Sequence, residues 1–301
     1  MKLALLTRNP KLYSTQRLAQ AAQARDHEIQ LLDTLRCYLA IKQPTPLVYY
    51  QGQALEQIDA VLPRIGASIG YYGTAVVRQF ELMGTYTLNT AQAINASRDK
   101  LLTAQLLTQQ GLNIPYSGFM HHQEDIRATA QLVGGAPLVI KLLEGTQGLG
   151  VILAEKQQLV DSVAEGLHAV KAAILLQEFI AEAEGADIRC LVLGEEVIAS
   201  MQRQAAKGEF RSNLHRGGSA AAISLSPEET TLAIQATQAL GLEFAGVDLI
   251  RTQRGPAILE VNSSPGLEGI EALTGTNIAE LVIKFIEDRL ESRHTVKPTT
   301  S

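Results

Sequence analysis

The first 95 residues alternate short apolar runs with longer amphipathic stretches, and this alternation limits the possible folds more than any other feature. The apolar runs have the length of strands, and the amphipathic stretches have the spacing of helices that bury one face. Strands separated by helices form parallel sheets, because a parallel connection needs a crossover that is usually a helix. A helix-covered parallel sheet is therefore predicted, and the GxGxxG pattern of dinucleotide-binding domains does not follow the first strand. The expected order is strand 3–7, helix 13–25, strands 28–33 and 58–66, and helix 73–84.

The rest of the chain predicts a different organisation. Residues 90–111 read as one long helix that begins at a capping threonine and ends at a glycine. Two hairpins are expected in the last third, one over 187–205 and one over 245–262. We therefore expect α/β structure over 1–95, α+β structure after it with a boundary near residue 185, and a flexible tail from 291 to 301.

Composition limits the class of protein. The chain has 301 residues, of which 46% are hydrophobic, and a formal net charge of −5. These values are typical of a soluble globular protein, whereas generic nucleic-acid-binding proteins are usually basic. The two cysteines form neither a metal-binding pattern nor a disulfide framework. No apolar stretch reaches the roughly 18 residues of a membrane-spanning helix. We expect a cytoplasmic protein that has no membrane span and requires no direct contact with nucleic acid.

Three oxygen-bearing side chains interrupt the second expected hairpin. Asp248 lies in one strand, and Glu260 and Asn262 lie two residues apart in the other, so the latter two share a face. The turn near residues 253–254 places Asp248 opposite Glu260. Carboxylate and amide oxygens are the ligands of a hard cation such as Mg²⁺. The alternative is the solvated face of an edge hairpin, but the neighbouring residues are apolar on both faces, where an unpaired acid is costly.

A lysine and a glycine-rich turn precede these hairpins. Lys141 stands inside an apolar strand, where lysine is unusual without a partner. The turn 144–150 contains three glycines, which let backbone N–H groups approach a phosphate. The arrangement is not a GxxxxGK[ST] phosphate loop, since the lysine precedes the glycines. A glycine-rich hairpin turn alone is weak evidence, but a lysine, a flap and a downstream oxygen cluster together favour a phosphate ligand.

Three further segments have both a functional and an ordinary interpretation. The charged triplet 98–100 fits either a ligand contact or a solvated helix face. Glu178, at a strand end, fits either an adenine-binding edge or an ordinary connecting strand. The loop 202–219 carries four basic residues and one acidic residue in an acidic chain. Such a loop suits an anionic ligand, and it equally suits a mobile basic surface.

Taken in order, these motifs resemble the RimK family of ATP-grasp α-L-glutamate ligases. The resemblance rests on RDKLLTAQLLTQQG, VIKLLEGTQGLGV, FRSNLHRGG, GVDLIR and EVNSSPGLEGIE, and it extends to RIG and YYGTAVVRQFE near the N-terminus. It implies an N-terminal parallel-sheet pre-ATP-grasp domain over 1–95. An ATP-grasp central subdomain with the flap would follow over 96–185, and a C-terminal subdomain with the metal site over 186–290. Thr146 stands in the flap where many relatives have serine, which keeps the hydroxyl in place.

The resemblance also implies roles for individual residues. Lys100 and Lys141 correspond to lysines at the ATP phosphates, and Asp187 to the residue at the ribose. Arg211 and Asn213 correspond to residues near the γ-phosphate and the acyl group. The implied catalytic residues are Arg211, Lys141 and Arg203; the implied nucleotide-binding residues are Lys100, Lys141, Gln177, Glu178, Phe179, Ile180, Asp187, Arg189, Arg211, Ser212 and Asn213; and the implied metal ligands are Asp248, Glu260 and Asn262.

The implied reaction activates a carboxylate with ATP. Mg²⁺ or Mn²⁺, with two ions expected, offsets the phosphate charge, and an acyl phosphate of the acceptor is attacked by the amine of L-glutamate. The implied acceptor is the C-terminus of a small-subunit ribosomal protein, poly-α-glutamate is a further candidate product, and relatives imply a homo-oligomer. Three alternatives stay open: a ligase of this fold with another amino acid or small-molecule acceptor, a kinase-like phosphotransferase, and a non-catalytic ribosome-associated binding protein.

Overall fold

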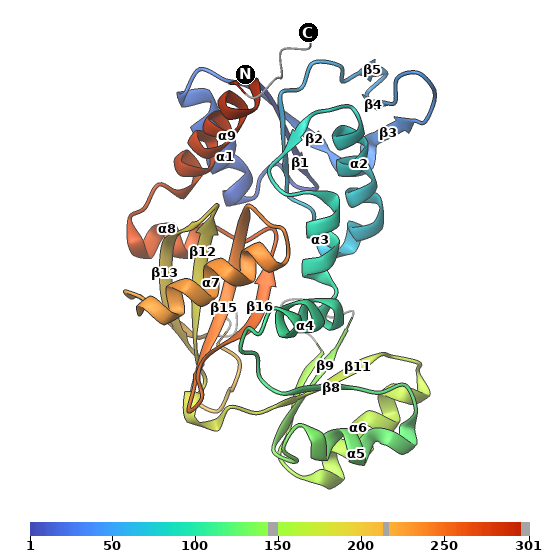
Figure 1. Cartoon of the computed structure of the whole chain (residues 1–301), viewed down its shortest axis with the longest axis vertical. Helices are drawn as coiled ribbons and strands as arrows, with labels where there is room; N and C mark the ends of the chain where they lie inside the picture. The colour runs from blue at the N-terminus through green and yellow to red at the C-terminus, as the bar shows by residue number, and fades with distance from the viewer. Residues whose placement is uncertain (144–149, 213–216, 296–301) are drawn as a thin grey trace.

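The computed structural model describes residues 1–143, 150–212 and 217–295. The described part is elongated, and three sheet-based regions follow one another along its long axis (Figure 1). The N-terminal sheet lies at one end, a five-stranded sheet lies in the middle, and a four-stranded sheet with two helices lies at the other end. The chain runs from the N-terminal sheet to the far end and back, since helix α9 (Ile278–Thr295) packs against helix α1 (Tyr13–Ala24).

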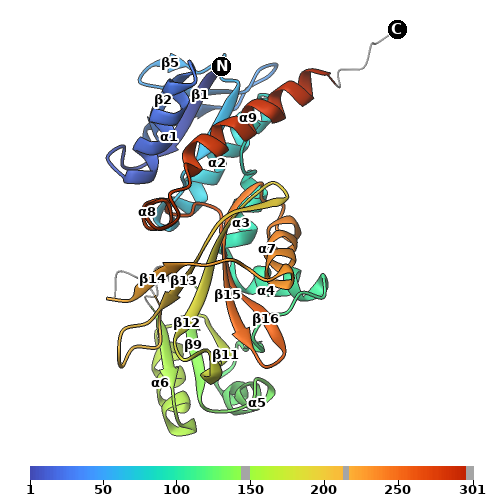
Figure 2. The same ribbon diagram turned by 90° about the vertical axis from the view of Figure 1, so that its left-hand side faces the viewer.

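The N-terminal sheet is parallel and has the strand order β2-β1-β6-β7, as the alternation of strands and helices predicts. Alternate residues of its central strand β1 pack into two different hydrophobic cores. Leu3 and Leu5 pack with α1 and α9, whereas Ala4 and Leu6 pack with helices α2 and α3. Figure 2 shows α9 along the side of this sheet. The bounds are β1 Lys2–Thr7, β2 Glu28–Asp33, β6 Ala60–Pro63, β7 Tyr86–Thr87, α2 Gly70–Leu82 and α3 Ala91–Arg98, and an unexpected small sheet consists of β3 Cys37–Ala40, β4 Leu47–Tyr50 and β5 Gln53–Ala54.

The single long helix predicted over residues 90–111 is two helices. Helix α3 ends at Arg98, and helix α4 (Lys100–Gln109) begins after Asp99. The Asp99 carboxylate accepts hydrogen bonds from the backbone N–H groups of Leu101 at 3.0 Å and Leu102 at 2.9 Å. An aspartate that caps a helix in this way adopts an extended backbone, so it interrupts a helical pattern that the apolar spacing alone would continue.

The four-stranded sheet at the far end is antiparallel, with the order β10-β9-β11-β8. Helices α5 and α6 cover one face, and their apolar residues form one core with Leu138, Ile140 and Leu176 of the strands. This arrangement leaves the other face, which includes Lys141 at the end of β9, turned away from the two helices. The bounds are β8 Ser117–Phe119, β9 Leu138–Leu142, β10 Val151–Ala154, β11 Ile174–Glu178, α5 Ile126–Leu132 and α6 Gln157–Ala169.

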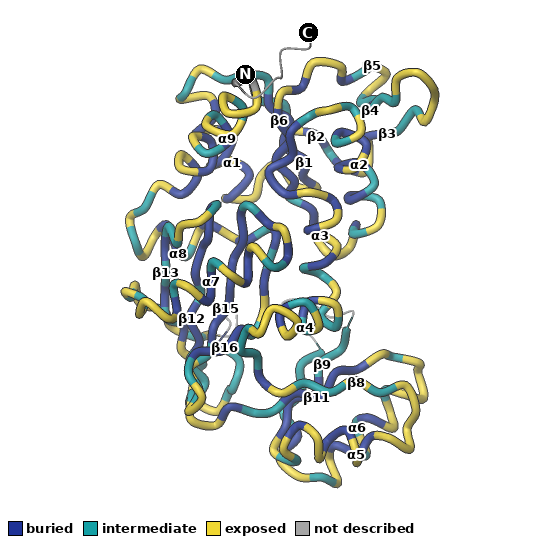
Figure 3. Tube along the Cα trace, viewed as in Figure 1, coloured by how far each residue is buried: buried dark blue, intermediate teal, exposed yellow. Residues whose placement is uncertain are grey.

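The middle sheet is antiparallel, with the order β14-β13-β12-β15-β16, and it contains both predicted hairpins. Helix α7 begins with a capping box formed by Ser226 and Glu229, and it packs on one face against Ile188, Cys190 and Val247. These strands are buried through the centre of the molecule (Figure 3). The bounds are β12 Ala186–Leu193, β13 Glu196–Gln204, β14 Ser219–Ala222, β15 Phe244–Thr252, β16 Gly255–Asn262, α7 Pro227–Ala239 and α8 Glu268–Thr274.

Two further observations concern the helices. In the described ranges, none of them has the length and apolar character needed to cross a membrane. Helix α9 continues to Thr295, within the stretch that the sequence assigns to a flexible tail, and residues 296–301 lie outside the described residues.

Candidate functional site

Five charged side chains gather on the face of the middle sheet opposite α7. They follow from strand alternation: where Ile188 and Cys190 of β12 face α7, the residues next to them face the other way. The register then places Arg189 beside Asp248 and Asp248 beside Glu260. Arg189 and Asp248 are therefore opposite charges on neighbouring strands, whereas Asp248 and Glu260 are two carboxylates side by side. The five residues are Arg203 on β13, Asp187 and Arg189 on β12, Asp248 on β15 and Glu260 on β16.

Asp248 is buried at the centre of this face and is paired with two arginines. The Nε and Nη2 atoms of Arg189 lie 2.7 and 2.6 Å from its two carboxylate oxygens, and Nη2 of Arg203 lies 3.1 Å from Oδ2. Burial alone would raise the pKa of Asp248, but the two guanidinium groups outweigh burial and hold the pKa below its usual range. Asp248 is therefore an anion at neutral pH, with its side chain fixed in orientation.

Arg203 lies between two carboxylates. It donates to Oδ1 of Asp187 at 2.7 Å as well as contacting Asp248, and the two acids outweigh burial to raise its pKa. Both oxygens of Asp187, the residue implied at the ribose, are bonded to Arg203. The sequence alone does not identify the partner of Asp187, because that partner depends on the register between β12 and β13.

Glu260 and Asn262 complete the predicted set of oxygen ligands. Glu260 is exposed, lies opposite Asp248 in the sheet, and has no hydrogen bond or ion pair to any described residue. Asn262 is half-buried, and its Nδ2 atom is buried without a partner among the described residues. Because the two ends of an amide differ by a 180° rotation, this orphaned position suits either a phosphate oxygen or, with Oδ1 there, a cation.

The residues present therefore fit a hard cation, provided that water or phosphate oxygens complete its coordination. Among the described residues, no group of three His, Cys, Asp or Glu side chains is arranged to hold a metal. A cation at this place would depend on two carboxylates and the amide of Asn262, completed by water or phosphate oxygens, which is the pattern Mg²⁺ favours. The metal-ligand assignment of Asp248, Glu260 and Asn262 stays a prediction.

Two lysines from other elements face these carboxylates. Burial lowers the pKa of Lys141 to about 8; the charge of Lys100 adds to this shift, while Glu260 and Asp248 oppose it. Burial also lowers the pKa of Lys100, again opposed by Glu260, and its Nζ donates to the Leu143 carbonyl at 3.1 Å. Glu260 thus acts electrostatically on both lysines, and Asp248 acts on Lys141, so these two cations and two carboxylates lie near one another. Such a group of charges suits a ligand that carries phosphates and their counter-ion.

The end of strand β11 meets the hairpin turn of the middle sheet. The Glu178 carboxylate, implied at the adenine, pairs with Arg254, whose guanidinium lies 4.2 Å from the ring centre of Tyr116. Gln177 is buried and donates to the Ser117 hydroxyl at 3.0 Å. Sequence reasoning missed Arg254 and Tyr116, because each is an unremarkable surface residue until the two sheets are brought together. Ile180 is buried beyond this strand end.

The described part of the basic loop bends back toward the far sheet. Arg211 pairs with Glu209 at 2.7 Å and donates to the carbonyl of Val151, the residue opposite Lys141 in the sheet, at 3.3 Å. The ring of Phe210 lies edge-on to Phe179, with 6.3 Å between ring centres. Ser212 is buried, and its hydroxyl helps to lower the pKa of Asp187. Asn213 and Arg216, and the flap residues 144–149, lie outside the described residues.

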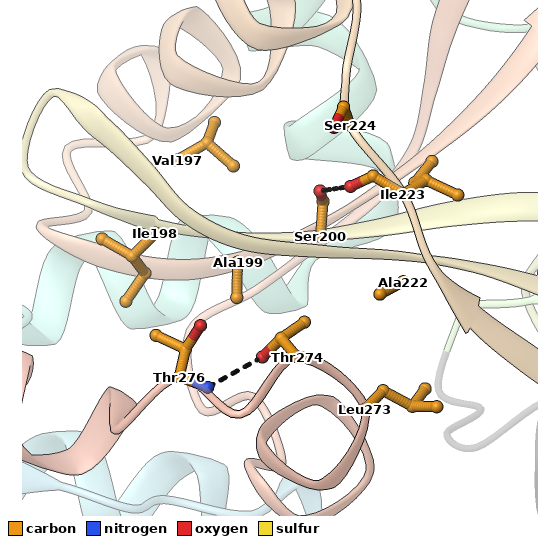
Figure 4. A pocket seen from close by; sticks show the side chains of 10 residues that line it. All are labelled: Val197, Ile198, Ala199, Ser200, Ala222, Ile223, Ser224, Leu273, Thr274 and Thr276. Atoms are coloured by element: carbon orange, nitrogen blue, oxygen red, sulfur yellow. Dashed lines mark hydrogen bonds between the residues drawn. The ribbon is translucent and has the colours of Figure 1, made fainter.

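Two hollows in the described surface lie elsewhere. One of about 490 Å³ is bordered by β13, the end of β14 and α8, and its lining includes Ser200, Ile223 and Thr274 (Figure 4). The other, of about 890 Å³, lies between α5 and α6. Neither is lined by a predicted catalytic, nucleotide-binding or metal-binding residue, so the candidate functional site is the charged face of the middle sheet.

Comparison with known families identifies the family to which this chain belongs. Residues 97–286 match the model of the RimK-like ATP-grasp domain, and residues 1–94 match that of the RimK PreATP-grasp domain. The chain belongs to the RimK-like ATP-grasp family. This RimK-like protein is thus an ATP-dependent ligase, and the family and fold expected from the sequence motifs are confirmed.

Curated relatives match the RimK-like protein over nearly its whole length. A protein of Hahella chejuensis, named probable alpha-L-glutamate ligase 1, is 56% identical over 300 residues, which cover 100% of this chain and 98% of that protein. A protein of Picosynechococcus, named probable alpha-L-glutamate ligase, is 56% identical over 287 residues, or 95% of each chain.

Solved structures confirm the fold. The ATP-grasp ligase PsnB complexed with minimal precursor has a TM-score of 0.76 and 23% identity, and covers 95% of this chain and 98% of that one. A RimK domain protein ATP-grasp from Sphaerobacter thermophilus has a TM-score of 0.74 and 23% identity, with coverage of 95% and 99%. PsnB complexed with a phosphomimetic precursor variant, Mg and ADP has a TM-score of 0.74 and 22% identity, with coverage of 95% and 98%.

Proposed function

We propose that this RimK-like protein is an α-L-glutamate ligase that joins L-glutamate to the C-terminal carboxylate of an acceptor peptide. The observation that carries the proposal is the charged space around Glu260, in which Asp248 is an anion held by two arginines and Lys141 and Lys100 approach from other elements. The names of relatives that are 56% identical support glutamate as the amino acid. The acceptor we propose is a small-subunit ribosomal protein, and the homo-oligomeric state stays a prediction.

The acidic and amide side chains of the site are proposed to bind the cation, and the lysines are proposed to bind the phosphates. Asp248, Glu260 and Asn262 would hold Mg²⁺ or Mn²⁺, which when bound offsets the negative charge of the ATP phosphates. Lys141 and Lys100 would attract the phosphates themselves, and a phosphate in turn favours their charged forms. Gln177, Glu178, Phe179 and Ile180 would contact the adenine at the strand end.

Arg189 and Arg203 act chiefly by positioning. Their hydrogen bonds hold the Asp248 carboxylate in one orientation before any ligand binds, so no reorganisation is needed when the cation arrives. Arg203 holds Asp187 in the same way. This assigns Arg203 a supporting task, in place of the direct catalytic task that the resemblance implies.

The proposed chemistry has two steps. An oxygen of the acceptor carboxylate attacks the γ-phosphorus of ATP, ADP leaves, and an acyl phosphate forms. The amine of glutamate attacks the acyl carbon, phosphate leaves with the bonding electrons, and the amine loses a proton. Arg211 would stabilise the oxyanion of the second step, since a guanidinium group keeps its charge throughout. Its present partner, Glu209, must release it first.

The proposal is tested by ADP release with a panel of amino acids and acceptor peptides, read by product mass. We expect ADP release to need both L-glutamate and a peptide acceptor, with the mass rising by whole glutamate residues. A different preferred amino acid or a small-molecule acceptor would establish the alternative ligase of this fold. A stable phosphorylated product would indicate a phosphotransferase instead.

A matched pair of variants ties this activity to the charged face. Glu260→Gln should reduce ADP release to background while leaving the urea unfolding midpoint unchanged, because Glu260 has no described bond to lose. Glu195→Gln, at an exposed hairpin position, is the control and should retain full activity. Full turnover by Glu260→Gln would remove this residue from the proposed site.

A further inference from the structure

Two arginines, Arg64 and Arg98, lie beside the charged face but take no part in its ion pairs. Arg64 follows strand β6, and its Nη2 donates to the carbonyl of Pro265 at 2.7 Å. The Ser264 hydroxyl donates back to the carbonyl of Pro63 at 3.4 Å. These contacts tie the loop after β6 to the turn that follows Asn262, so Arg64 sits directly beyond the proposed metal ligands. Arg98, at the end of α3, donates to the carbonyl of Ile65 in the same loop.

Neither arginine has a carboxylate partner among the described residues. Burial alone lowers the pKa of Arg64 to about 10, and burial alone lowers the pKa of Arg98, so both remain cations at neutral pH. The Nη1 atom of Arg98 is buried and donates to nothing described. By contrast, Arg189 and Arg203 are paired with acids that raise their pKa values. Both side chains are half-buried. A partly desolvated cation with an unused buried donor is costly, and an anion would reduce that cost.

The surroundings add positive potential and leave room. A Cβ built on Gly70 would lie 2.8 Å from Arg98 Nη1, so the guanidinium lies at the first residue of helix α2. That helix has no side-chain cap and no acidic residue in its first turn, and its N-terminus carries partial positive charge. A Cβ built on Gly66 or on Gly266 meets no atom within 4 Å. A small anion therefore has space beside both loops.

We propose that Arg64 and Arg98 bind a carboxylate of the incoming amino acid, and so make the ligase selective for an acidic, doubly charged substrate. The inference rests on the proposed function and adds the residues that recognise its amino acid. When the acceptor carboxylate becomes an acyl phosphate, its negative charge lies on the phosphate and leaves with it, whereas the incoming amino acid keeps both carboxylates throughout the reaction. A permanent anion matches cations that have no carboxylate partner among the described residues. A guanidinium fork also offers two parallel hydrogen bonds to one carboxylate.

The test compares L-glutamate with its two half-amides in the steady state. Glutamine lacks the side-chain carboxylate, and isoglutamine lacks the α-carboxylate. Arg64→Gln should raise KM for glutamate roughly 10- to 100-fold, the usual cost of a lost charge-assisted hydrogen bond. The preference for glutamate over one of the two amides should fall by a similar factor, and that amide identifies which carboxylate the arginine holds. KM for ATP and for the acceptor peptide should stay unchanged.

Two further variants separate recognition from a structural task. Arg98→Lys keeps a charge but not the fork, and it should raise KM for glutamate in the same direction as Arg64→Gln. Arg78→Lys, on the exposed face of α2, should change nothing. If the Arg64 and Arg98 variants keep wild-type selectivity, or if KM for ATP rises equally with KM for glutamate, the inference is overturned. Failure of the proposed function differs, because the wild type itself would then release no ADP with glutamate.

Discussion

Replacing Arg203 by methionine tests the ion-pair network at the centre of the site. The side chain is 5% exposed and contacts three carboxylate oxygens, two of Asp187 and one of Asp248. Asp248 keeps Arg189 in this variant, but Asp187 loses both bonds to arginine. Removing one member of a buried ion pair leaves an uncompensated charge and costs about 3–5 kcal/mol. Since whole domains are stable by about 5–15 kcal/mol, Arg203→Met should lose a large share of the free energy of unfolding.

The assay is urea unfolding at pH 7 and at pH 5. Burial already raises the pKa of Asp187 above its ordinary value in the wild type, and the loss of Arg203, which opposes this shift, should raise it further in the variant. A raised carboxyl pKa destabilises the fold above the unfolded pKa, and this penalty diminishes as the pH falls toward the folded pKa. The loss measured at pH 5 should therefore be smaller than the loss at pH 7.

A second substitution completes the cycle. Asp187→Asn in the Arg203→Met background removes the stranded charge and should recover part of the lost stability, so the two substitutions should be strongly non-additive. A loss below about 1 kcal/mol for Arg203→Met, or simple additivity with Asp187→Asn, would refute the view that the network holds Asp187 and Asp248 in place.

Three other expectations follow from local geometry. The affinity of the free enzyme for ATP, measured by isothermal titration calorimetry, should weaken as the pH rises through about 8. Burial lowers the pKa of Lys141 to about 8, and only the charged form of Lys141 attracts phosphate. Lys141→Arg should make ATP affinity less dependent on pH. Gly150→Ala should lower the melting temperature, because φ is +74° and the new Cβ would lie 2.5 Å from the Leu142 side chain. Gly166→Ala, in helix α6 with nothing within 4 Å, should instead stabilise the protein by roughly 0.5–1 kcal/mol. Asp99→Ala should lose about 1 kcal/mol in urea unfolding with the cap of α4, and an unchanged midpoint would show that the cap adds nothing.

Local patterns in the sequence determined the elements and some of their pairings. Alternating strands and helices predicted the parallel N-terminal sheet, and turn residues predicted both hairpins. The position of one hairpin turn set Asp248 opposite Glu260, as the structure confirms, because residues close in sequence pair through a short turn of known length. The same locality failed at Asp99, where apolar spacing continued a helix that a side-chain cap divides.

Only the tertiary structure decided which charges meet. Arg189 meets Asp248 across 59 residues of sequence, and Arg64 meets Pro265 across 201. Composition and periodicity show that a charged residue is present and which face of its strand it occupies, but not which segment packs against that face. The Nη1 atom of Arg98, which has no partner among the described residues, and the lowered pKa of Lys141 both result from burial between segments far apart in the chain. Burial and pairing are properties of the assembled sheets, and therefore the partners of these residues could not be predicted from the sequence.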